Sequence, residues 1–135
     1  IVCWVIAMTD EEKKTIKQVK QFFKKDYPRY KQLSVFADLS SVAFDGVKSS
    51  SNINHQEQRM VKAIEAKRIV KLVDTIIDNI CDRRYKTILK KCYLQNVPKW
   101  QVENELMYSH SMFFELQNRA LLLFAELCSN FIEIK

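Results

Sequence analysis

Two neighbouring segments near the C-terminal end of the chain carry hydrophobic residues at helical spacing. Val102 and Leu106 lie four residues apart, and a longer apolar series begins after Ser109. The members of that series are Phe113, Leu116, Ala120, Leu121 and Phe124. Their spacing places them on one face of a helix, and Ser109 is suited to cap its start. The pattern therefore predicts a helix, a short turn and a longer helix over residues 97–127, the arrangement called a helix-turn-helix.

A capping box marks the start of the first predicted helix. Thr9 and Glu12 have the T-x-x-E spacing that satisfies the first backbone N–H groups of a helix. Apolar residues then follow at helical spacing, namely Ile16, Val19, Phe22 and Phe23. We expect a helix over residues 10–25 that ends at 26–28, where a proline interrupts the pattern, and a short further helix over 30–41.

The segment 45–54, DGVKSSSNIN, has the Gly, Ser and Asn content of an exposed linker and hinge. After it, one long amphipathic helix is expected over residues 55–81, with inward residues Met60, Ile64, Ile69, Val73, Ile76, Ile77 and Ile80. Asp82 is suited to cap the next helix, whose inward residues are Tyr85, Ile88, Leu89 and Cys92. The predicted division is an N-terminal helical segment 9–44, the linker 45–54 and a helix-turn-helix domain 55–135. Residues 1–8 are interpreted as upstream translation or a cloning scar.

Composition favours an all-α helical bundle. The 135 residues include one glycine and two prolines, too few for a sheet with many tight turns. The 22 Lys and Arg residues against 16 Asp and Glu residues give a net charge of +6. Such a charge favours polyanionic partners such as DNA or RNA. The apolar stretch 1–7 is too short to cross a bilayer, so no membrane association is expected.

The four cysteines, Cys3, Cys81, Cys92 and Cys128, have neither metal-ligand spacing nor nearby histidines. The last three lie among apolar neighbours, so we expect buried free thiols in a reducing cytoplasm. No Gly-rich phosphate loop, paired carboxylates or catalytic motif occurs. The sequence therefore predicts no enzyme, no cofactor and no metal site.

The exposed face of the last predicted helix is the candidate site. To read a DNA sequence, the first turns of this helix must enter the major groove. There Glu115 is suited to accept from a cytosine amino group and Phe114 to contact a thymine methyl group. The candidate DNA-binding residues are Ser109, His110, Ser111, Phe114, Glu115, Asn118, Arg119 and Lys99. An ordinary helical hairpin with these residues merely on its surface is the alternative that spacing leaves open.

The first predicted helix carries the densest positive patch of the chain. Its lysines are Lys13, Lys14, Lys17, Lys20 and Lys24, followed by Lys25, Arg29 and Lys31. This pattern fits either a solvated face or an auxiliary surface for phosphate contacts. Trp100 also has two interpretations, base stacking or packing against the preceding helix, and packing is favoured.

The segment 88–126, ILKKCYLQNVPKWQVENELMYSHSMFFELQNRALLLFAE, resembles the ArpU family of phage and prophage transcriptional regulators, with a terminal YSxSxFxxLxxxALLxFAE pattern. More distantly, it is similar to the promoter-recognising fourth region of sigma factors. The resemblance implies a sigma-like helix-turn-helix that binds duplex DNA and regulates late or autolysin-linked phage genes. It places on the recognition element Ser109, His110, Ser111, Phe114, Glu115 and Arg119.

The chain departs from that pattern at three points. Met107 stands where such turns usually have glycine, so a non-glycine residue is expected to adopt a left-handed conformation. Glu103 replaces a small residue where the two helices approach. Because Arg119 is the one firm positive charge on the recognition face, phosphate contacts are expected from elsewhere, namely from Lys90, Lys91, Lys99 or the first helix.

The expected partners are double-stranded DNA and, in addition, RNA polymerase. The alternative is a protein-binding module that docks on RNA polymerase or another regulator through the run Met112–Phe114. RNA binding is a third possibility. From Ala120 onward the last helix is apolar nearly all round, which exceeds what one buried stripe needs. We therefore expect a homodimer with the last helix at the interface, unless the first helix covers the surplus through Phe22 and Phe23.

Overall fold

The computed structural model describes residues 8–43, 53–129 and 131, and these contain helices and no strand. The α-helices are α1 (Asp10–Gln21), α2 (Tyr27–Ala43), α3 (Ile53–Asp78), α4 (Arg83–Ile88), α5 (Lys99–Leu106) and α6 (His110–Cys128). Two π-helical segments, η2 (Phe22–Asp26) and η3 (Leu89–Leu94), interrupt this series. The predicted all-α class is confirmed.

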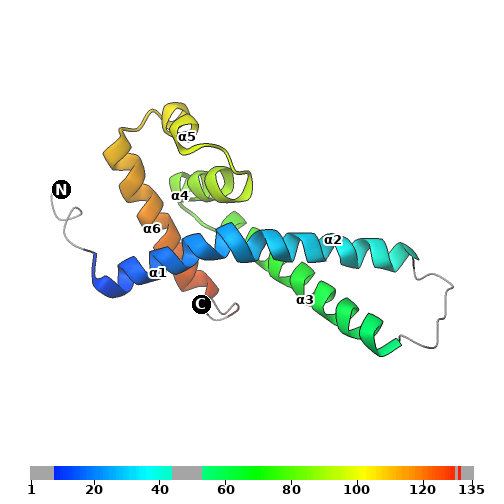
Figure 1. Ribbon diagram of the computed structural model, residues 1–135. Helices are drawn as coiled ribbons and strands as arrows, with labels where there is room; N and C mark the ends of the chain where they lie inside the picture. The colour runs from blue at the N-terminus through cyan, green and yellow to red at the C-terminus, as the bar shows by residue number, and fades with distance from the viewer. Residues whose placement is uncertain (1–7, 44–52, 130, 132–135) are drawn as a thin grey trace.

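The first helix starts as its sequence predicts but does not end where predicted. The Thr9 hydroxyl accepts a hydrogen bond from the Glu12 N–H at 3.2 Å, and the Glu12 carboxylate accepts from the Thr9 N–H at 3.1 Å. The predicted end at residues 26–28 is wrong, because α1, η2 and α2 follow one another without a break (Figure 1). In η2 the Tyr27 N–H reaches back five residues to the Phe22 carbonyl. The regular ladder is therefore already altered when Pro28, which has no N–H, enters the helix.

The helices α2 and α3 form an antiparallel hairpin that projects from the rest of the molecule (Figure 1). The extent of α3 agrees closely with the predicted long helix. Ile64 was expected to face inward, but it is exposed, and Ala63 and Ala66 are buried instead. These small side chains allow close approach of the two helices. At the base of the hairpin, the Tyr27 hydroxyl donates to Asp74 Oδ1 at 3.3 Å.

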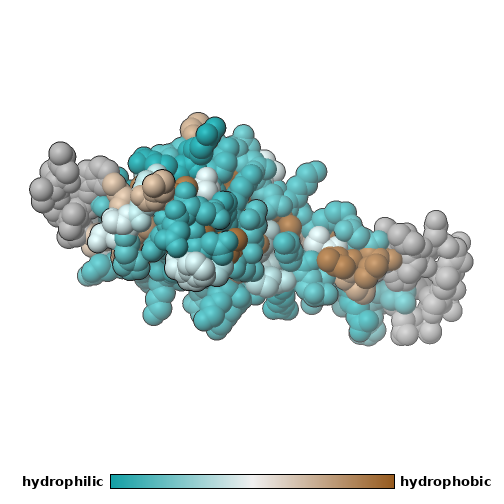
Figure 2. All heavy atoms as spheres, turned by 90° about the horizontal axis from the view of Figure 1, so that it is seen from above, coloured by the Kyte–Doolittle hydropathy of each residue, from teal (hydrophilic) through white to brown (hydrophobic). Residues whose placement is uncertain are grey.

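Most of the predicted linker lies outside the described residues, and its last two residues begin α3. Residues 1–7 also lie outside them. Figure 2 shows a largely hydrophilic face with apolar side chains gathered toward the end of the α2–α3 hairpin. The large apolar side chains exposed on this hairpin are Val35, Phe36, Leu39, Val61 and Ile64.

The larger hydrophobic core joins α1, η2, the start of α2 at Tyr27, α3, η3 and α6. At its centre is an aromatic cluster that consists of Phe22, Phe23, Tyr93 and Phe124. The Phe23 ring lies 4.9 Å from the Phe124 ring and 5.2 Å from the Tyr93 ring, measured between centroids. The N-terminal helix therefore covers much of the apolar surface on α6 that suggested a dimer. The homodimer stays a prediction, but the apolar surface of α6 no longer supports it.

A smaller core joins α4, α5 and α6. It consists of Ile88, Val102, Phe113 and Leu116, each at most 1% exposed. The Asp82 side chain caps α4 by accepting from the Arg84 N–H at 2.9 Å, as predicted. The five-residue apolar stripe of α6 is buried throughout and is divided between the two cores. This division positions the N-terminal half of α6 beside α4 and α5.

Replacement of Phe124 by alanine should strongly destabilise the protein. Phe124 is fully buried and contacts rings from the N-terminal helix, so Phe124→Ala should lower the free energy of unfolding by about 3–5 kcal/mol. Phe131→Ala is the matched control, because this ring is 58% exposed. Urea unfolding followed by circular dichroism measures both. Equal losses in the two variants would contradict the packing described.

Candidate nucleic-acid interface

The turn between α5 and α6 has a left-handed residue at its centre. Met107 has φ 58° and ψ 37°, the conformation predicted for this position. The Tyr108 N–H donates to the Glu103 carbonyl at 3.2 Å, and the Met107 N–H donates to the Asn104 carbonyl at 3.3 Å. This pair of bonds is the Schellman motif, which normally uses glycine at the left-handed position. The turn is therefore closed by backbone bonds at a cost in steric strain.

Side chains also hold the start of α6 against α5. The Ser109 hydroxyl accepts from the Met112 N–H at 3.2 Å, which confirms its predicted role as the helix cap. Glu103 lies at the approach of the two helices, and its carboxylate is 2.8 Å from Nδ1 of His110. Glu103 thus stabilises the turn in two ways. Its backbone carbonyl accepts the hydrogen bond from Tyr108, and its carboxylate contacts His110, the first residue of α6.

The predicted recognition residues do not all share one open face. His110, with its side chain 84% exposed, and Ser111 are open to solvent, whereas Glu115 and Arg119 are partly covered. The prediction that Asn118 faces outward is wrong, since this residue is only 4% exposed. Asn118 follows Phe114 by one turn on the same flank of α6. That flank meets α1, because Lys20 of α1 lies against the Phe114 ring.

Two of the recognition residues contact each other along α6. Arg119 Nη2 lies 3.6 Å from Glu115 Oε1, an i, i+4 ion pair. That Oε1 atom is buried and accepts no hydrogen bond from a described residue. The carboxylate would have to turn away from Arg119 to meet a base.

Trp100 does not pack against the preceding helix as favoured from sequence, because it is 64% exposed. Val102 is the inward residue of α5 and is fully buried. Two residues before it, Trp100 points to the opposite side of the helix. Its ring is therefore available to a partner beside the start of α5.

Of the lysines considered for phosphate contacts, some form ion pairs with acidic side chains and others do not. Lys90 pairs with Asp78 at 2.5 Å, and Lys91 pairs with Glu105. The hydrogen bond from Lys90 holds the pKa of the Asp78 carboxyl below its ordinary value, and the bond from Lys91 does the same for Glu105. Lys99 forms no ion pair with a described residue. Among the described residues, the lysine next to α6 without an ion pair is thus Lys99 rather than Lys90 or Lys91.

Lys20 joins this surface from the N-terminal helix. Its Nζ lies 5.9 Å from the centroid of the Phe114 ring, in a cation–π contact. Burial, and secondly the positive charge of Lys99, lower the pKa of Lys20. The structure thus brings together Lys20, Lys99 and Phe114 from three helices. Sequence spacing could not show this, since these residues are far apart in the chain.

Two of the described cysteines, Cys92 and Cys128, are not activated thiols. Burial raises the pKa of Cys128 to about 12, and desolvation raises the pKa of Cys92 to about 11, so both are neutral at pH 7. The prediction that Cys81 is buried is wrong, because it is exposed in the bend after α3. Among the described residues, no group of His, Cys, Asp and Glu side chains is arranged to hold a metal ion. None of the described helices is both long and apolar enough to span a bilayer.

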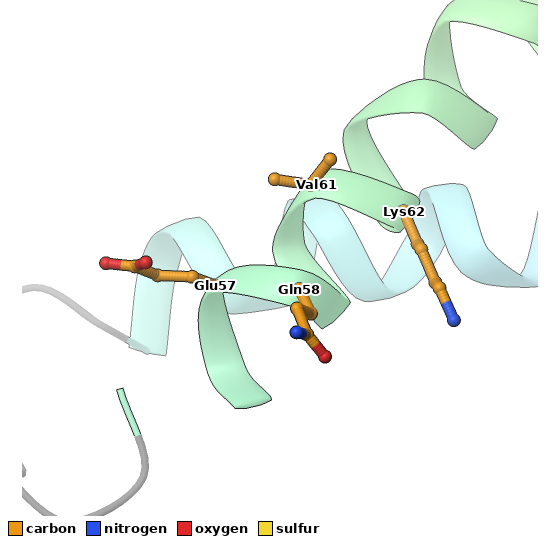
Figure 3. Close-up of a pocket in the computed structure, with 4 residues that line it drawn as sticks. All are labelled: Glu57, Gln58, Val61 and Lys62. Carbon is orange, nitrogen blue, oxygen red and sulfur yellow. The ribbon is translucent and has the colours of Figure 1, made fainter. Parts of the chain in front are cut away.

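A hollow on the N-terminal part of α3 is lined by Glu57, Gln58, Val61 and Lys62 (Figure 3). These side chains come from one helix and do not converge on a common point. None of them was predicted as a site residue. The α5–α6 surface is therefore the stronger candidate for function.

The comparisons with known proteins show a family for this chain. A family model described as a protein of unknown function, DUF1492, matches residues 47–124, and the chain belongs to that family. The match includes α3 to α5 and most of α6. No curated protein and no solved structure matches the chain. The resemblance to ArpU regulators goes beyond this family match and stays a prediction.

Replacement of Met107 by glycine should stabilise the protein. Met107 is 88% exposed and left-handed, so Met107→Gly removes strain without loss of packing and should raise the free energy of unfolding by about 1 kcal/mol. Asn104→Gly, at an exposed helical position of α5, should instead lower it slightly, by roughly 0.3 kcal/mol. Thermal unfolding compares the two variants. A destabilised Met107→Gly protein would refute the strain at this turn.

Proposed function

We propose that this protein is a transcriptional regulator that binds double-stranded DNA in a sequence-specific manner through α5 and α6. The observation that carries the proposal is the position of Lys99 and Lys20, which form no ion pair with a described residue, beside the open first turns of α6. A recognition helix needs such flanking charge because phosphate contacts supply much of the affinity for DNA. The resemblance to ArpU regulators and to the fourth region of sigma factors supports regulation of phage or prophage genes.

The shape of the α5–α6 pair is also consistent with a sigma-like helix-turn-helix. The Ser109 cap and the contact between Glu103 and His110 fix the start of α6, where a recognition helix approaches base edges. In this proposal Ser111 faces the bases, the Glu115 carboxylate turns from Arg119 to meet them, and Arg119 faces a phosphate. Asn118 has no role in DNA contact, because it is buried.

Exposed apolar side chains favour one second candidate, a protein-binding module that docks on RNA polymerase or another regulator. Met112 and Phe114 in the first turns of α6 are 37% and 51% exposed, and Trp100 is also exposed. Large apolar side chains of this kind anchor protein interfaces. If the protein binds DNA as proposed, these residues instead lie beside the major groove that α6 enters.

Selection of duplex fragments from the source genome, followed by mobility shifts over a salt series, tests the proposal. We expect enrichment of a defined sequence and an affinity that falls steeply with salt, because DNA binding releases counterions. Binding to RNA polymerase that changes little with salt, without binding to any duplex, would favour the protein-binding module instead. Stronger binding to single-stranded RNA than to duplex DNA would also contradict the proposal.

Glu115 and Arg119 should have different effects on DNA binding. Glu115→Ala should change which sequences are preferred, whereas Arg119→Ala should weaken binding to all sequences and lower the salt slope by roughly one unit. Glu126→Ala is the control, since Glu126 is an exposed acid near the other end of α6. Mobility shifts with the selected fragment and with scrambled fragments measure these effects. Equal losses on every sequence in both variants would refute the assignment.

A further inference from the structure

Two lysines from different helices add positive charge near the second turn of α6. Lys20 belongs to α1, and Lys99 is the first residue of α5. The Lys20 ammonium lies 5.9 Å from the centroid of the Phe114 ring of α6, and the positive charge of Lys99 contributes, after burial, to lowering the pKa of Lys20. Neither lysine forms an ion pair with a described residue. Glu103, the acid one turn after Lys99, is directed to His110 instead.

The local backbone adds to the positive potential at this point. The first turn of α5 contains no acidic residue, and Pro98 before it provides no side-chain cap. The N-terminal end of a helix carries partial positive charge, so a lysine as its first residue is unfavourable unless an anion lies nearby. Two ammonium groups and a helix N-terminus thus add positive charge near this part of α6, and neither lysine has an acidic partner in an ion pair among the described residues. A bound anion would offset this positive charge.

We propose that Lys20 and Lys99 form a binding site for one backbone phosphate of a DNA duplex, at the edge of α6 marked by Phe114. The inference rests on the proposed function and deepens it, because it makes α1 part of the DNA-binding surface. The site lies next to the first turns of α6, where phosphates border the major groove that a recognition helix enters. Phosphate contacts fix the position and orientation of a protein on the duplex. The site would therefore set how α6 enters the groove.

The test compares Lys20→Gln, Lys99→Gln and the double variant with the unaltered protein. The probe is a duplex of random sequence of about 30 base pairs, and its affinity is measured over a salt series. We expect each single variant to bind more weakly and the double variant to lower the slope of log affinity against log salt by about one unit, because one phosphate is shared. Lys20→Arg should keep the slope of the unaltered protein, since the charge remains.

The control variant is Lys14→Gln with Lys62→Gln, which removes the same charge from exposed positions on α1 and on the hairpin. Its slope should stay that of the unaltered protein, and circular dichroism checks that all variants keep their helices. A slope reduced by about two units in the Lys20 and Lys99 double variant would mean two separate phosphates and would overturn the shared site. A slope equal to that of the control would also overturn it. Failure of the unaltered protein to bind any duplex would instead overturn the proposed function, and the site with it.

Discussion

The contact between the N-terminal helix and α6 through the aromatic cluster is the constraint on which the structure depends. Phe22 and Phe23 enter the larger core from one side, and Phe124 and Tyr93 meet them from α6 and η3. Tyr93 also accepts a hydrogen bond from the buried Gln117 amide at 2.6 Å, which satisfies a polar group inside this core. Without these rings, α6 would expose a large apolar flank. With them, α1 has a fixed position across α6.

That fixed position determines which side chains of α6 remain open. One side of α6 is buried against α4 and α5 in the smaller core, and another is covered by α1. What remains near its start is a narrow strip that contains His110 and Ser111 and continues to the partly covered Glu115 and Arg119. Only one basic residue lies in this strip. Much of the affinity for a polyanion must therefore come from the helices on either side of it, where Lys20 and Lys99 lie.

Local chemistry and helical periodicity predicted the features that depend on neighbouring residues. The caps at Thr9, Asp82 and Ser109, the left-handed Met107 and the buried stripe of α6 are of this kind, because each is set within a few residues. The errors have another cause. Continuation of the helix through Pro28 and burial of Asn118 both depend on where α1 and η2 pack in space. The pairing of Lys90 and Lys91 with acids 12 and 14 residues away is likewise a result of tertiary structure.

Ion pairing in the folded chain determines which lysines are left to act on the candidate surface. Net charge alone cannot distinguish one lysine from another, but the fold neutralises Lys90 and Lys91 and leaves Lys20 and Lys99 without acidic partners among the described residues. Lys20 lies near the end of α1, directly before the η2 segment that carries Phe22 and Phe23. The hydrophobic core and the positive surface are thus linked through α1: the rings that stabilise the fold also position the charge beside α6. A change that shifts α1 across α6 would alter the surface without any substitution in α5 or α6.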